Sequence, residues 1–167
     1  MAGEKCLFCG IAAGRIPAKK VYEDKKHLGV LDINPRNPGH IVMIPKKHYA
    51  TIFEMPDNEA GELFAAVKNV AGQVKTAMKA DGISIAQSNG AYAGQIIGHV
   101  HFHVIPRFKD EGPISLEERL SVKRLDDKMM NQIAAAIKKG KLPEQKEITP
   151  EKIVSESEDD EEFDLDI

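Results

Sequence analysis

Three histidines at every second position, His99, His101 and His103, constrain this chain more than any other feature of its 167 residues. They lie within G-Q-I-I-G-H-V-H-F-H-V-I-P-R, which spans residues 94–107. Side chains alternate between the two faces of a β-strand, so this spacing predicts a strand with three imidazoles on one face and apolar residues on the core face. Imidazole can act as a nucleophile, as an acid or base, or as a metal ligand near neutral pH. The pattern therefore indicates a functional site, either for catalysis or as three ligands of one metal.

The two cysteines, Cys6 and Cys9, form a C-x-x-C pair. Two thiolates supply half of a tetrahedral zinc shell, and His48 and His99 are candidates for the other half. A redox role is the alternative, but no thioredoxin-like strand precedes the pair. This use of cysteine favours a reducing, cytoplasmic setting.

The remaining pattern predicts short strands around one long helix. Apolar runs bounded by turn residues indicate strands at 20–24, 27–31, 40–45 and 83–87, in addition to the histidine strand. Apolar residues recur at helical spacing from Asp57 to Ala80, with Asp57 as the expected cap; they are Leu63, Phe64, Val67, Val70, Val74 and Met78. Further helices are expected at a capping-box pattern over 115–118 and at 126–139. The glycine-bearing loop at 88–97 can bring backbone amides close to a phosphate.

Charge divides the chain into two parts. Residues 1–143 carry 21 basic and 15 acidic side chains, whereas residues 144–167 carry 2 basic and 11 acidic ones. The resulting charges of +6 and −9 suit an anionic substrate for the body and predict a disordered tail. We expect no membrane association and no export, because neither a long apolar run nor a leader is present.

The chain resembles the histidine triad (HIT) family over about residues 5–108, and looks most like its Hint-related and bacterial or archaeal branch. The motif His-φ-His-φ-His-φ-φ, with φ apolar, is matched by residues 99–105. Further matches lie at 6–9, 16–18, 32–33, 39–40, 44–48, 89–90 and 94–95. The resemblance implies an α+β fold with a five-stranded antiparallel sheet, one long helix and C-terminal helices, paired as a homodimer. We therefore divide the chain into a HIT domain at 1–140 and an acidic tail at 141–167.

The resemblance also implies roles for individual residues. His101 would be the nucleophile, with His103 and His40 in the same catalytic cluster. The implied substrate-binding positions are Asp32, Ile33, Asn89, Gly94, Gln95 and His103, with Asp32 on the ribose and Gln95 and His103 on the α-phosphate. Structural zinc would be held by Cys6, Cys9, His48 and His99, which leaves His101 free for chemistry.

The implied reaction is hydrolysis or transfer of a purine nucleoside 5'-monophosphate, as from a phosphoramidate, through a nucleotidyl-histidine intermediate. Alternatives are a dinucleoside polyphosphate hydrolase and a nucleotide-binding adaptor with little catalysis. Two departures bear on the leaving group: Ile96 stands where many members have Ser or Thr, and the chain has no Trp, so the Trp-Pro-Pro-Gly type of ending is absent.

The tail has no counterpart in the family that helps to interpret it. A solubilising role is one interpretation, because acidic residues dominate the segment. Phe163, Leu165 and Ile167, however, interrupt the acidic run at every second position. These apolar residues favour a second interpretation, in which the tail docks on a protein partner or on the basic body.

Overall fold

The computed structural model describes residues 6–112 and 125–138. The chain divides into two compact units, Met1–Ile114 and Ser115–Ile167, and each is described by itself. The candidate site lies in the first unit. The predicted acidic tail and the capping-box pattern at 115–118 lie outside the described residues.

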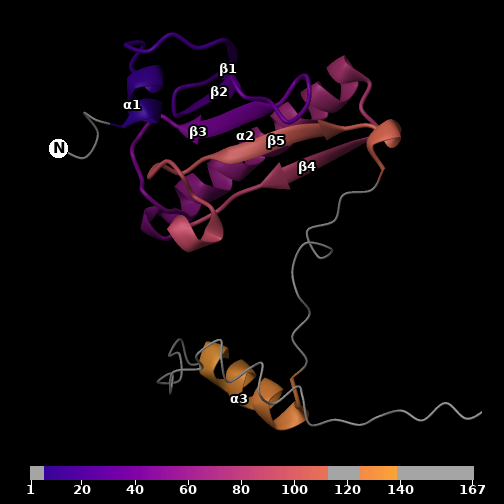
Figure 1. The fold of residues 1–167 in the computed structure, drawn as a ribbon. Coiled ribbons are helices and arrows are strands. Elements are labelled where there is room, and N and C mark those ends of the chain that lie inside the picture. Colours follow the sequence, from indigo (N-terminus) through magenta and orange to yellow (C-terminus); the bar gives the residue numbers. More distant parts are fainter. Residues whose placement is uncertain (1–5, 113–124, 139–167) are drawn as a thin grey trace, which may run out of the picture. The chain divides into compact units, whose positions relative to one another are not determined.

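The first unit is built on a five-stranded sheet with the order β1-β2-β3-β5-β4 (Figure 1). All neighbouring strands are antiparallel. The strands are β1 (Lys20–Glu23), β2 (His27–Leu31), β3 (Ile41–Pro45), β4 (Gly82–Ala86) and β5 (Phe102–Arg107). The predicted five-stranded antiparallel sheet is confirmed.

The turn between β1 and β2 is fixed by Asp24. Its Oδ1 accepts hydrogen bonds from the backbone N–H groups of Lys26 and His27, at 2.7 and 2.6 Å. This Asx-type turn holds the hairpin without a glycine. The register continues into the next strand, where His27 lies opposite Pro45.

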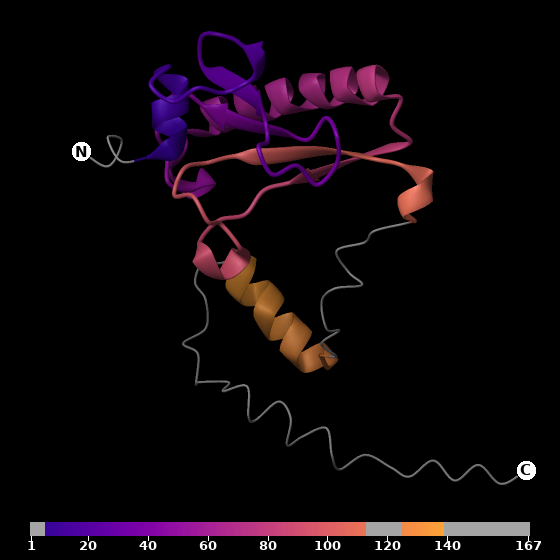
Figure 2. The same ribbon diagram turned by 45° about the horizontal axis from the view of Figure 1, so that its top comes forward.

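The long helix α2 (Asp57–Met78) packs on one face of the sheet (Figures 1 and 2). Its buried stripe consists of Leu63, Ala66, Val67, Val70, Ala71 and Val74. The helical spacing predicts Phe64 in the core, but Phe64 is 53% exposed, because it lies at the margin of the stripe, where its ring meets that of Phe102 edge-on. The apolar residues that alternate with the histidines, Val100, Phe102 and Val104, belong to this core as the pattern predicts.

The ends of α2 differ from the prediction. Pro56 occupies the N-cap position and no side chain caps the helix, so Asp57 is its first residue and not its cap. At the other end Lys79 adopts a left-handed conformation, with φ of 53°, and Ala80 N–H donates to Lys75 O. A left-handed residue after the last turn closes the helix in the way that glycine usually does.

The opposite face of the sheet is covered by α1 (Leu7–Ala12), which contains Cys9. Phe8 and Ile11 of this helix pack with Leu28, Val30, Val42 and Ile44 in a second apolar cluster. The short helix thus brings the cysteine pair against the same side of the sheet as the histidines.

The second unit contains α3 (Asp127–Lys138), as the pattern at 126–139 predicts. Asp126 Oδ1 accepts a hydrogen bond from the N–H of Met129 at 2.7 Å, which caps the start of the helix. Within the described residues, no helix combines the length and the apolar composition that a bilayer span requires.

Candidate functional site

The residues predicted as metal ligands come together from three separate segments. Cys6 Sγ lies 3.4 Å from His99 Nδ1, and Cys9 Sγ lies 3.4 Å from His48 Nδ1 and 3.5 Å from His99 Nδ1. The two Nδ1 atoms are 3.2 Å apart. All four ligand atoms lie within 4.8 Å of one another.

These separations are those of the edges of a zinc tetrahedron. Bond lengths of about 2.3 Å to sulfur and about 2.05 Å to nitrogen give S···N edges of about 3.6 Å and N···N edges of about 3.3 Å. The chemistry of the donor set agrees, since two thiols and two imidazoles form one of the common structural zinc shells. The residues therefore fit a single zinc ion.

His99 is oriented for this role by the carbonyl of Pro45. Its Nε2 lies 2.8 Å from Pro45 O and must donate, which leaves the lone pair on Nδ1, the atom that faces the thiols. Burial lowers the pKa of His99 to about 4, so the ring is neutral at pH 7. Burial and, to a smaller extent, a hydrogen bond with Cys6 raise the pKa of the Cys9 thiol. A nearby cation would therefore be needed to stabilise its thiolate form.

The histidine segment differs from the predicted strand. β5 begins at Phe102, so only His103 lies in regular sheet, while His99 and His101 precede it. The three rings do not gather around one point: His99 turns to the cysteines and His103 to His40. A single metal bound by all three histidines, one of the alternatives that the pattern left open, does not match this arrangement.

Phe8 packs against His99 and His101, and sequence reasoning missed it. Its ring centroid lies 5.8 Å from that of His99 and 5.2 Å from that of His101. As a result His99 is fully buried and His101 is only 8% exposed. The one signal for Phe8 in the sequence is its place between the two cysteines.

His101 is held in one tautomer. Its Nδ1 lies 2.8 Å from the carbonyl oxygen of His99, and this nitrogen must carry the proton because a carbonyl can only accept. The lone pair is then on Nε2, which makes no hydrogen bond to any of the described residues. The arrangement leaves Nε2 of His101 as a nucleophilic nitrogen.

A chain of hydrogen bonds fixes the other two imidazoles. Arg36 N–H donates to His40 Nδ1 at 3.2 Å, so His40 carries its proton on Nε2 and donates it to His103 Nδ1 at 2.9 Å. His103 Nε2 is therefore an N–H donor. Burial lowers the pKa values of His40 and His103, that of His103 to about 4, and both rings are neutral at pH 7.

Asp32 lies beside this relay of hydrogen bonds from Arg36 through His40 to His103, and Ile33 follows Asp32 in the sequence. Asp32 Oδ2 lies 3.5 Å from His40 Nδ1 and 4.0 Å from His103 Nδ1, while Oδ1 accepts from Asn34 N–H at 2.8 Å. The three groups could also hold a metal ion by distance alone, but the hydrogen bonds of the relay already account for three of the four imidazole nitrogens. Ile33 is 89% exposed, which leaves its apolar surface open to a ligand.

The loop predicted to face phosphate is clamped by Gln95. Its Oε1 accepts from Gly90 N–H at 2.7 Å, and its Nε2 donates to Ala50 O at 2.7 Å and to Ile97 O at 3.1 Å. Both amide protons of Gln95 are thus taken. Gly94, with φ of 89°, precedes it and supplies the left-handed turn that aims the side chain inward.

The side chain of Asn89 also makes its hydrogen bonds within the protein. Its Oδ1 accepts from Ile52 N–H at 2.9 Å, and its side-chain amide exchanges hydrogen bonds with that of Gln87. In contrast, Tyr92 and Ile96 on this loop are almost fully exposed. The sequence predicted the position of the loop. It did not predict that Asn89 and Gln95 bind the backbone of segment 50–52, because no local pattern indicates this contact.

Comparison with known proteins shows the family of the chain. The HIT domain family matches residues 13–110. A HIT-like protein of Methanocaldococcus jannaschii, itself described as uncharacterized, is 49% identical over 65% of this chain and 84% of its own length. The adenylylsulfatase HINT3 of Arabidopsis thaliana is 35% identical over 87% of this chain and 75% of its own. The adenosine 5'-monophosphoramidase hnt1 of Schizosaccharomyces pombe is 35% identical over 77% of this chain and 98% of its own.

A solved structure extends the likeness to three dimensions. The crystal structure of a HIT family member from Bacillus subtilis is 34% identical, with a TM-score of 0.73, and covers 85% of this chain and all of that one. With its five-stranded sheet and its histidine motif, the chain belongs to the HIT family.

Proposed function

We propose that the protein hydrolyses or transfers the nucleotidyl group of nucleoside 5'-monophosphate derivatives, with purine nucleoside phosphoramidates as its type substrates. The observation that carries this proposal is the orientation of His101, whose Nδ1–H is bound to His99 O so that Nε2 holds a lone pair. Two relatives with hydrolase names, an adenylylsulfatase and an adenosine 5'-monophosphoramidase, support the same class of reaction.

The reaction runs in two displacements at phosphorus. His101 Nε2 forms a bond to the α-phosphorus, the bond from phosphorus to the leaving amine breaks, and the amine takes a proton from solvent because Ile96 offers no hydroxyl. Water then attacks the phosphorus, the bond to Nε2 breaks, and the nucleoside monophosphate leaves while the water proton passes to solvent. His101 regains its lone pair on Nε2, and Nδ1 keeps its proton, which stays hydrogen-bonded to His99 O throughout.

His103 and Asp32 supply binding in this scheme. The Nε2–H of His103, fixed by the His40 relay, is a neutral donor that can bond to a phosphate oxygen without losing its proton. The Asp32 carboxylate can accept from ribose hydroxyls, and exposed Ile33 offers an apolar surface to the base. Gly94 shapes the loop, and Gln95 and Asn89 hold it in place.

We also propose that Cys6, Cys9, His48 and His99 hold a structural zinc ion. Bound zinc would fasten α1 to the sheet, and four protein ligands leave no open position for a water nucleophile. We further propose a homodimer in the cytoplasm, supported for the dimer by the edge position of β4 and by the exposed Ile85 on it.

Trapping the intermediate tests the nucleophile. Adenosine phosphoramidate is mixed with the wild-type protein, the reaction is stopped within one turnover, and intact mass is measured. We expect a gain of one adenylyl group, absent from a His101→Ala variant that keeps its zinc and its circular dichroism spectrum. Adenylylation or hydrolysis by His101→Ala would refute the assignment.

A substrate panel separates the two alternatives. Diadenosine polyphosphate is supplied in parallel with the phosphoramidate, and the kcat/KM values are compared. Faster turnover of the polyphosphate would favour a dinucleoside polyphosphate hydrolase. Nucleotide binding without turnover of any member of the panel would favour an adaptor.

A further inference from the structure

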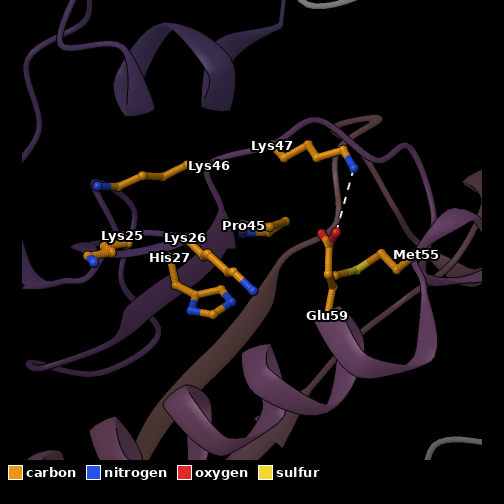
Figure 3. A pocket seen from close by; sticks show the side chains of 8 residues that line it. All are labelled: Lys25, Lys26, His27, Pro45, Lys46, Lys47, Met55 and Glu59. Atoms are coloured by element: carbon orange, nitrogen blue, oxygen red, sulfur yellow. Dashed lines mark ion pairs between the residues drawn. The ribbon is translucent and has the colours of Figure 1, made fainter.

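A concave surface lies outside the group formed by His40, His101 and His103. It is a cavity of about 400 Å³ lined by four lysines, Lys25, Lys26, Lys46 and Lys47, together with the acid Glu59 (Figure 3). The first two lysines come from the turn between β1 and β2, and the others follow β3. No residue of the candidate active site lines it.

The backbone holds the two lysine pairs together. Lys46 N–H donates to Lys26 O at 2.7 Å, which continues the pairing of His27 with Pro45 by one residue. The two bends that carry the four lysines are thus joined by a backbone hydrogen bond at one end of the sheet. Figure 3 shows Lys25 and Lys46 extending to the same side and Lys47 turned toward Glu59.

Three of the four lysines that line the cavity are ion-paired with a glutamate. Lys26 pairs with Glu62 at 2.5 Å, Lys46 with Glu23 at 2.8 Å and Lys47 with Glu59 at 3.6 Å. Lys25 has no ion pair with any described residue. Of the three glutamates in these pairs, Glu59 alone is among the residues that line the cavity.

An anionic ligand can replace the carboxylates in these ion pairs. In each pair at least one side chain is more than 40% exposed, and exposed pairs contribute little to stability. An incoming anion must outcompete carboxylates of single charge, which favours an anion that carries several charges in a small volume. Lysine suits phosphate as a point charge, and a cavity of this size suits a small molecule and not an extended chain.

We propose that this lysine pocket binds a small anion with two or more linked phosphate groups, of which inorganic pyrophosphate is the simplest. The pocket lies at the start of β2 and Asp32 follows its end, five residues or about 17 Å along the strand. The two sites are therefore separate, and the proposal does not depend on the reaction proposed for His101.

Titration of the ¹⁵N-labelled full chain with pyrophosphate, followed by NMR, tests the proposal. We expect saturable shifts of the amides of residues 25–27, 46 and 47, with orthophosphate at equal ionic strength binding about tenfold more weakly. The variant Lys25→Gln/Lys46→Gln should weaken pyrophosphate binding by about tenfold, because two unit charges near the anion are removed. Lys25→Gln alone, which breaks no ion pair to a described residue, provides a second variant if the double one does not fold.

The control is Lys68→Gln/Lys75→Gln on the exposed side of α2, which changes net charge by the same amount. We expect this control to bind pyrophosphate as the wild type does. Equal weakening in both double variants would show attraction by net charge alone and overturn the proposal. Shifts confined to the surroundings of His40 and His103, no saturable shift, or tighter binding of a short single-stranded oligonucleotide would also overturn it.

Discussion

Replacing Gln95 by Ala separates two roles for this side chain. The family resemblance implies a contact to phosphate, whereas the structure uses its amide to hold Gly90, Ala50 and Ile97 together. If the clamp dominates, Gln95→Ala lowers the free energy of unfolding as well as activity. If phosphate contact dominates, activity falls and stability does not change.

The size of the effect follows from three hydrogen bonds at a side chain that is 8% exposed. Each buried hydrogen bond contributes about 1 kcal/mol, and the groups left without partners add a further cost, so we expect a loss of about 2–4 kcal/mol. Urea denaturation followed by circular dichroism measures this loss, and kcat and KM are measured below the transition.

Gln73→Ala, on the exposed side of α2, is the matched control and should change stability by less than about 0.5 kcal/mol. Gln95→Glu tests the donors separately, because it keeps an acceptor for Gly90 N–H but turns an oxygen toward two carbonyls. A Gln95→Ala protein as stable as the wild type, with only KM raised, would refute the clamp.

Three further predictions concern the metal cluster, the relay and the tail. His99→Ala should lose zinc and unfold at lower temperature than His101→Ala, which keeps its metal; equal zinc content in both, by elemental analysis, would exclude His99 as a ligand. Because burial sets the pKa of His103 to about 4, below the ordinary value near 6.5, unfolding takes up a proton at this residue, and stability should fall as pH drops from about 6.5 toward 4. Denaturation midpoints across that range should have a smaller slope in His103→Asn, and an unchanged slope would contradict the assignment. Deleting residues 144–167, which carry 11 acidic and 2 basic side chains, should leave fold and zinc intact and lower KM for an anionic substrate at low salt only; identical KM values at low salt would rule out autoinhibition by the tail.

The local sequence pattern predicted the helices and strands, because the residues that indicate each of them lie close together in the chain. The apolar run before Pro45 and the helical spacing from Leu63 to Val74 reflect burial against a core, and both elements formed as expected. The Cys6 and Cys9 pair indicated a metal cluster for the same reason, since the ligand types are visible in the sequence.

Features that depend on distant segments could not be predicted. Strand β5 begins at Phe102 and not at His99, because the preceding residues bond to another segment. Val100 N–H donates to Tyr49 O, and the ring of His99 donates to Pro45 O. The tautomer of His103 depends on the amide of Arg36 through His40, a partner more than 60 residues away. Hydrogen-bond partners of this kind are set by tertiary packing and leave no periodic trace.

The side chain and the backbone carbonyl of His99 have different partners. The side chain of His99 contacts the cysteines, while its backbone carbonyl accepts a hydrogen bond from Nδ1 of His101. A lineage that lost both cysteines could therefore replace the imidazole by any buried side chain that fills the space under Phe8. It could not move the peptide unit, because the hydrogen bond that fixes the tautomer of His101 would then be lost. In a comparison of sequences, substitutions at position 99 should accordingly follow those at Cys6 and Cys9 rather than those at His101.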